Sequence, residues 1–316
     1  MGMPRRPSHL PLRARGVALL AVMLVVALAT VTTAALATRQ VLEIRRAANL
    51  LEAEQAYQYA LGAEDWAVGT LASDALGEAV DGAADRWAKP LGPMAVDGGQ
   101  VAARIEDLQG RFNLNSLVRE GEPNELDVQR FDRLLAFLGI APGVRDAVLD
   151  WLDPDTSPRL PDGAEDDRYL KLEPPRRAAN GPIAHPSELR LILGLEPGDY
   201  ERLEPYITAL PEPTEINLNT APLPVLVSLA QDLREEDVKA FMSDRQTEGF
   251  KNVEEALRHQ AFAGVPVAVV GLAVESRYFR VHAQATYGRG RAELLSLVSR
   301  RPSEPPAVVL RERGMR

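Results

Sequence analysis

A group of carboxylates in the middle of the chain contains the residues best suited to chemistry. They crowd one proline-bounded stretch as Asp150, Asp153, Asp155, Asp162, Glu165, Asp166 and Asp167. Ca²⁺ binds about six to eight oxygen atoms, and an irregular acidic loop supplies them readily. A solvated loop paired with Arg159, Arg168, Arg176 and Arg177 explains the same residues. Composition alone favours the solvated loop, because the EF-hand spacing of calcium ligands is missing.

The other residues of catalytic type are not spaced for a known reaction. The 4 histidines are scattered, at His9, His185, His259 and His282. No H-E-x-x-H, G-x-S-x-G or P-loop motif is present. The chain has 0 cysteines, which excludes disulfides, thiolate zinc sites and cysteine nucleophiles. We therefore expect a protein that is not an enzyme.

One long helix is expected to carry the rest of the chain. Good helix formers and no proline fill residues 39–71. From Ala53 to Leu71, apolar residues recur at helical spacing on one face. The helix should run from near Val17 to about Thr70, roughly 80 Å at 1.5 Å per residue. Its first half is apolar all round, and its second half is amphipathic.

Alternating patterns predict strands at both ends of the body. They cover residues 101–107, 277–287 and 291–299, with a possible edge strand at 307–313. Between the helix and the first strand, a further helical turn is expected through Ala84–Ala88. Breaks follow at Pro90, Gly92 and Pro93. The expected fold class is α+β, with an antiparallel sheet packed on the long helix.

The middle of the chain contains an internal echo. Phe112-Asn-Leu-Asn-Ser116 is repeated as Ile216-Asn-Leu-Asn-Thr220, and helical patterns follow each copy. We expect two related all-α modules, SAM-like or helix-hairpin-helix-like, inserted between the strands. The expected helices cover 124–151 with a break at Gly139, 187–193, 198–210, 221–229, 235–245 and 253–257. The expected division of the chain is 1–16 (leader), 17–72 (long helix), 73–114 (start of the head), 115–213 and 214–274 (the modules), and 275–316 (C-terminal strands).

A helix-hairpin-helix suggests an alternative function, that of a DNA-binding membrane protein. Such a motif binds phosphate through the backbone of a glycine hairpin. Here the hairpin is Ala230–Asp237, which has no glycine and is strongly acidic. The net charge of −9 also argues against non-specific nucleic-acid binding. We expect no nucleic-acid partner.

The N-terminus allows three interpretations. Arg13-Ala-Arg-Gly16 precedes an uncharged apolar run, 17–38, which is long enough to cross a bilayer. The run could belong to a cleaved signal peptide ending near Ala35-Leu-Ala37, to a plain membrane anchor, or to a prepilin-type helix cut after Gly16. The basic residues before the run predict a cytoplasmic N-terminus and an exported body.

Several motifs together resemble one protein family over nearly the whole chain. They are G-R-F-N-L-N-S-L at 110–117, D-W-L-D-P-D at 150–155, G-A-E-D at 163–166, A-A-N-G-P at 178–182 and E-I-N-L-N-T-A at 215–221. With the leader and the long helix, they are similar to minor pseudopilin K of type II secretion systems, the general secretion pathway protein K family. This resemblance implies a type IV pilin-like fold. It also implies an inner-membrane protein with a periplasmic body, at the tip of a pseudopilus with pseudopilins I and J.

The same resemblance implies roles for individual residues. Prepilin peptidase would cut between Gly16 and Val17, and Val17 would be N-methylated. Ala21, the fifth mature residue, replaces the glutamate of most pilin-like proteins, as expected at a tip position; an apolar helix also accepts alanine without any such reason. Calcium in the insertion is implied as well. The expected ligands are Asp153, Asp155, Glu165 and Asp166, followed by Asp150.

Overall fold

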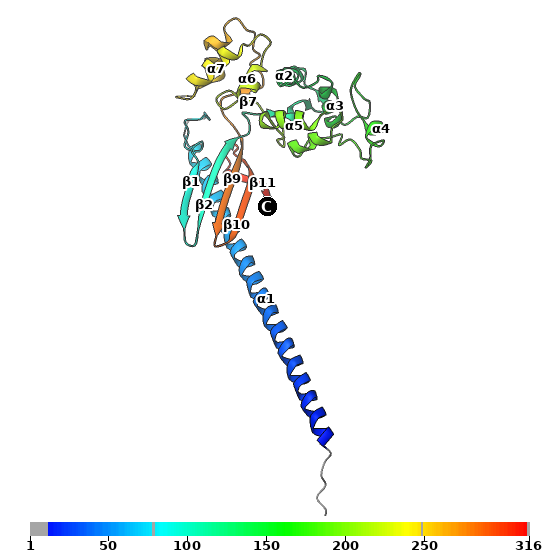
Figure 1. Cartoon of the computed structure of the whole chain (residues 1–316). Coiled ribbons are helices and arrows are strands. Elements are labelled where there is room, and N and C mark those ends of the chain that lie inside the picture. Colours follow the sequence, from blue (N-terminus) through cyan, green and yellow to red (C-terminus); the bar gives the residue numbers. More distant parts are fainter. Residues whose placement is uncertain (1–11, 78–79, 248, 315–316) are drawn as a thin grey trace, which may run out of the picture.

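The computed structural model describes residues 12–77, 80–247 and 249–314. The first eleven residues of the expected leader lie outside the described residues. Helix α1, Leu12–Asp74, is 63 residues long. Figure 1 shows it as one continuous rod whose first half projects from the head. The expectation of a single long helix is confirmed, and the helix continues a few residues beyond the expected end.

Five antiparallel strands form one sheet in the order β1-β2-β9-β10-β11. Their bounds are β1 Leu91–Val96, β2 Gly99–Asp107, β9 Tyr278–Tyr287, β10 Gly290–Ser299 and β11 Ala307–Arg313. The register of β2 against β9 runs from Gly99 opposite Tyr287 to Asp107 opposite Phe279. Strands from both ends of the body are therefore neighbours, which confirms the antiparallel sheet.

Two expectations for the segment before β2 are wrong. Residues 91–96 form an edge strand, although Gly92 and Pro93 indicated a break. An edge position tolerates proline because its missing N–H would face outward rather than join the ladder. Ala84–Ala88 forms hydrogen-bonded turns instead of a helical turn.

The second half of α1 packs on one face of this sheet. The contact is lined by small side chains, at most 3% exposed: Ala56, Ala60, Ala63 and Ala67. They meet the buried face of β2, β9 and β10, where Phe279 and Val281 are fully buried. Alanine on the helix allows the sheet to approach closely. The amphipathic second half is thus explained by packing on the head.

The first half of α1 packs on nothing within the described part of the chain. Its large apolar side chains, from Val17 to Leu36, are more than half exposed. In the described residues, α1 is the one helix long and apolar enough to cross a membrane.

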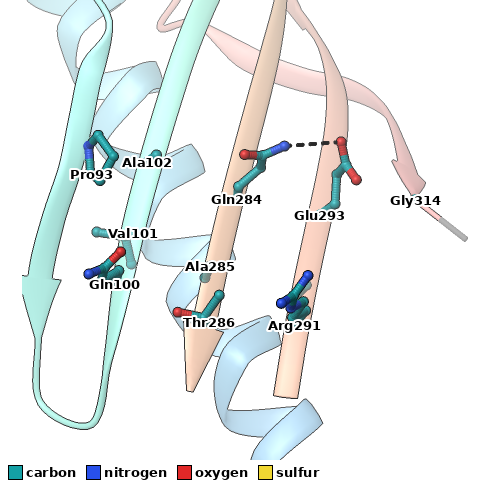
Figure 2. A pocket seen from close by; sticks show the side chains of 11 residues that line it. Pro93, Gln100, Val101, Ala102, Gln284, Ala285, Thr286, Arg291, Glu293 and Gly314 are labelled. Atoms are coloured by element: carbon teal, nitrogen blue, oxygen red, sulfur yellow. Dashed lines mark hydrogen bonds between the residues drawn. The ribbon is translucent and has the colours of Figure 1, made fainter. Parts of the chain in front are cut away.

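The opposite face of the sheet is polar and open at the end away from the insertion. Figure 2 shows Gln100, Gln284, Thr286 and Glu293 in a shallow hollow on this face, with α1 behind the sheet. Gln284 Nε2 donates a hydrogen bond to Glu293 Oε1 at 3.3 Å. Since these side chains are polar, this end of the face needs no covering layer.

The insertion between β2 and β9 contains short helices and small two-stranded pairings. Its first part has α2 Glu125–Phe137, α3 Gly143–Leu152, α4 Asp166–Tyr169, η2 Pro186–Leu191, α5 Pro197–Leu203 and η3 Glu204–Tyr206, with the hairpin of β4 Val118–Arg119 and β5 Glu122–Pro123. Its second part has α6 Leu223–Val227, α7 Glu235–Asp244, α8 Val253–Leu257 and η4 Gln260–Phe262. The helix expected over 198–210 ends early, because Ile207 and Thr208 form β6.

The echoed sequences occupy equivalent places in the two parts. β3 (Phe112–Asn113) pairs in parallel with β6, and β7 (Ile216–Asn217) pairs in parallel with β8 (Leu272–Ala273). Each part of the insertion is thus closed by one short parallel pair that joins its beginning to its end.

The echoed asparagines also make equivalent hydrogen bonds. The first asparagine of each copy accepts the N–H two residues later: Asn113 from Asn115, and Asn217 from Asn219. The second bonds both backbone groups of a distant residue, Asn115 with Ile183 and Asn219 with Phe250. These buried amides satisfy backbone groups that the irregular chain leaves free.

Candidate functional site

Three carboxylates of the acidic stretch converge in the first part of the insertion. Asp150 and Asp153 lie at the C-terminal end of α3, and Glu165 lies just before α4. One oxygen from each lies within 4.8 Å of the others. All three side chains are buried, with at most 2% of each residue exposed. We call this group the insertion site.

Only one cationic side chain, among the described residues, pairs with this group. The guanidinium of Arg159 lies 2.7 Å from Asp153 Oδ2 and 3.5 Å from Asp150 Oδ1. Asp150 also accepts the backbone N–H of Arg159. One positive charge therefore faces three buried carboxylates, and the site has an excess of negative charge.

Several oxygens at the insertion site are buried without a hydrogen-bond partner. They are Asp153 Oδ1, both carboxylate oxygens of Glu165, and Asn180 Oδ1. Leaving such atoms unpaired in a protein interior is costly. A hard cation would satisfy oxygens of this kind, since Ca²⁺ prefers carboxylate and amide oxygens. The donor set therefore fits calcium.

The electrostatics of the insertion site agree with this interpretation. Burial, together with the charges of Asp150 and Asp153, raises the pKa of Glu165 to about 7. Burial likewise raises the pKa of Asp150 and of Asp153. Without a cation, the carboxylate charges are therefore disfavoured at this position.

Two of the five expected ligands lie outside this convergence. Asp155 accepts the backbone N–H of Ser157 at 2.7 Å. Asp166 accepts the N–H of Ala178 at 3.0 Å and lies 3.3 Å from the guanidinium of Arg177. Both carboxylates have protein partners and stabilise the loop around the site.

Asn180 contributes a further buried, unpaired oxygen, Oδ1, which reasoning from the sequence missed. Its side-chain Nδ2 donates to the carbonyl of Asp155 at 2.6 Å, and its backbone has a positive φ of 45°. Asparagine tolerates this conformation better than most residues do. The signal for it was the A-A-N-G-P motif, where an asparagine precedes glycine in a turn.

The two parts of the insertion each resemble a known family. Residues 110–212 and 216–275 match two family models, both described as type II secretion system (T2SS), protein K. The type II secretion system protein K of Pseudomonas aeruginosa is 40% identical over 310 residues, which are 95% of this chain and 92% of that protein. This chain belongs to the type II secretion system protein K family.

Other members of the protein K family agree in length and fold. The protein of Klebsiella pneumoniae is 33% identical over 304 residues, covering 91% of this chain and 93% of that protein. A solved structure, the GspK-GspI-GspJ complex of the enterotoxigenic Escherichia coli type 2 secretion system, matches with a TM-score of 0.76 and 27% identity. The match covers 86% of this chain and 100% of the chain compared.

The residues expected to be processed lie at the start of the apolar half of α1. Gly16 and Val17 are helical, and the Val17 side chain is 68% exposed. Ala21, one turn further, is also exposed. In this chain, the first half of α1 is an apolar helix whose described side chains pack on nothing, so its surface is available to lipid or to other helices.

Proposed function

We propose that this chain is the minor pseudopilin at the tip of a type II secretion pseudopilus. There it would help to initiate pseudopilus assembly and protein export across the outer membrane. The observation that carries this proposal is the position of the insertion. It lies at the end of the head farthest from the apolar half of α1 (Figure 1). Such a bulky cap would block another subunit from stacking above it.

The proposed location is the bacterial inner membrane, crossed once by residues 17–38. The basic residues before this stretch favour a cytoplasmic N-terminus and a periplasmic body. Prepilin peptidase would cut between Gly16 and Val17 and leave an N-methylated Val17. The partners would be I-type and J-type minor pseudopilins, as in the solved complex of the relative. The head would be pilin-like, the two parts of the insertion SAM-like, and the role structural rather than enzymatic.

We further propose calcium as the ion of the insertion site. Asp150, Asp153, Glu165 and Asn180 would supply oxygen ligands, on the evidence of their buried, unpaired oxygen atoms. Asp155 and Asp166 would hold the surrounding loop in shape. The ion would supply the positive charge that Arg159 alone does not provide, and would thereby join the end of α3 to the start of α4.

DNA binding is not part of this proposal. The first turn of α7 carries Glu235, Glu236 and Asp237, which would repel phosphate.

The test uses the full-length chain expressed with prepilin peptidase and with the I-type and J-type partners. N-terminal sequencing and mass measurement should find a chain that begins at methylated Val17, and affinity purification should recover both partners. The matched control is Gly16→Leu, which should remain uncut and anchored. A mature chain that begins at Thr38, or recovery of neither partner, would contradict the proposal.

A further inference from the structure

A second group of carboxylates lies at the opposite end of α1 from the membrane. Asp74 is the last residue of α1, and Asp81 and Asp85 follow in the loop that leads to β1. One oxygen from each lies within 4.8 Å of the others. We call this group the helix-end site. It belongs to the head, and it shares no residue with the insertion site.

One side chain compensates part of this negative charge. Arg300 lies 2.8 Å from Asp74 Oδ2 and also pairs with Asp81 Oδ2. Asp85 has no described ion pair, and its Oδ2 accepts the backbone N–H of Gly82 at 2.7 Å. One guanidinium among three carboxylates leaves an excess negative charge at the end of α1.

Asp81 provides a separate sign that a ligand is missing. The residue is 1% exposed. Its Oδ2 is fully used, by Arg300 and by the backbone N–H of Ser276 at 2.7 Å. Its Oδ1 is buried and has no hydrogen-bond partner. An unpaired buried carboxylate oxygen is costly, and Asp81 is one of the three carboxylates that converge here.

Space for an ion with bound water lies next to this group. A hollow of about 440 Å³ is lined by Asp74 and Asp85 together with Thr70 and Ser73. The hydroxyls of Thr70 and Ser73 donate to carbonyls of α1, so their oxygen lone pairs remain available. Arg86 and Lys251 also line the hollow. Their positive charges should make binding weaker here than at the insertion site.

We propose that Asp74, Asp81 and Asp85 bind a second divalent cation of the calcium type, with water completing its coordination. The unpaired oxygen of Asp81 would be a direct ligand. The ion would fasten the end of α1 to the loop before β1, and through Asp81 to Ser276, where the chain returns from the insertion. Burial raises the pKa of Asp81 to about 6, which agrees with a carboxylate that lacks sufficient compensation.

The test is calcium binding by the full-length chain in detergent micelles, measured by isothermal titration calorimetry with CaCl₂. Asp85→Asn removes a charge while its amide oxygen can still accept the Gly82 N–H. Asp153→Asn disables the insertion site, and Asp65→Asn, an exposed residue of α1, is the matched control. In the Asp153→Asn background, calcium should still bind at the helix-end site and raise the melting temperature. Adding Asp85→Asn to that background should weaken this binding by at least about tenfold.

The two cation proposals can fail separately. If Asp153→Asn alone abolishes all calcium binding up to about 10 mM, beyond the range of weak extracellular sites, the helix-end site is wrong and the insertion site stands. If Asp153→Asn changes nothing and Asp85→Asn removes all binding, the insertion site is wrong instead. A double variant that binds as tightly as Asp153→Asn alone would overturn the helix-end site. Binding of Mg²⁺ with equal affinity would contradict the calcium type.

Discussion

At the scale of single residues, Glu165 is the most sensitive to whether a cation is bound. Its folded pKa of about 7 lies above the ordinary value of 4.5. In the calcium-free chain, this shift stabilises the fold fully below pH 4.5, and the stabilisation is lost as pH rises through about 7. The shift corresponds to a loss on the order of 3 kcal/mol. Chemical unfolding in a chelator, repeated between pH 4.5 and pH 8, would measure this loss.

A substitution of Glu165 that keeps the shape of the side chain but removes its charge tests the role of that charge. Glu165→Gln should remove most of the pH dependence. It should also reduce the rise in melting temperature caused by calcium to the part that the helix-end site contributes. Asp167→Asn, at an exposed residue in the first turn of α4, is the matched control and should change neither. An unchanged calcium response in Glu165→Gln would exclude Glu165 as a ligand.

The sequence allowed a partial prediction of the insertion site. Asp150 and Asp153 lie about one helical turn apart, so their convergence follows from helix geometry. Whether Asp155 and Asp166 join the site depends on which backbone N–H group lies nearest to each side chain. The spacing of residues in the sequence does not reveal that. Asn180 is neutral and follows a proline-rich segment, so only the folded loop brings it to the carboxylates.

At the scale of elements, the echoed asparagines explain how the insertion is attached. Asn217 is fully buried, and its Nδ2 lies within 3.1 Å of Asp81 O, Asp107 Oδ2 and Ser276 Oγ. Asn217→Ala would leave several of these groups unpaired and should lower the free energy of unfolding by about 3 kcal/mol. Gln58→Ala, on the exposed face of α1, should change it by less than about 0.5 kcal/mol. Equal effects in chemical unfolding would contradict this role.

The contact between α1 and the sheet contains one buried charge. Glu64 is 0% exposed, accepts from Ser296, and pairs with Arg311 on β11. Arg311→Met would leave that carboxylate unpaired and should destabilise the head by about 3 kcal/mol. Adding Glu64→Gln should recover part of the loss, because it removes the buried charge. A melting temperature of Arg311→Met equal to that of the unmodified chain would show that the pair contributes nothing.

The elements with a clear period were the easiest to predict. β9 alternates buried and less buried side chains over most of its length, and β10 forms its hairpin partner across a glycine turn. The sequence did not predict β1, because Pro93 argues against a strand and the apolar pattern around it is short. Its strand state comes from pairing with β2 rather than from its own residues. The same holds for β6, where pairing with β3 overrides the expected helix.

At the scale of the whole molecule, substitutions in the apolar half of α1 should reveal the position of this chain in the assembly. A carboxylate in the bilayer costs up to about 3 kcal/mol unless a charge compensates it. At a tip, no subunit above would supply that charge, so Ala21→Glu should reduce the yield of assembled pseudopili. Ala21→Val keeps the surface apolar and should assemble normally. Pseudopili counted in extracts from both variants would decide, and equal yields would contradict the tip assignment.

The pairing of β2 with β9 has a consequence for modularity. Asp107 and Phe279 are opposite one another, so the chain leaves and re-enters the head across a single ladder rung. The whole of 108–278 therefore occupies the place of a β-hairpin turn. An inserted domain whose two ends lie side by side joins the strands at an entropic cost of loop closure little greater than that of a short loop. The head should accept a two-residue Asn-Gly turn in its place, and foreign domains with adjacent termini should be tolerated at the same position.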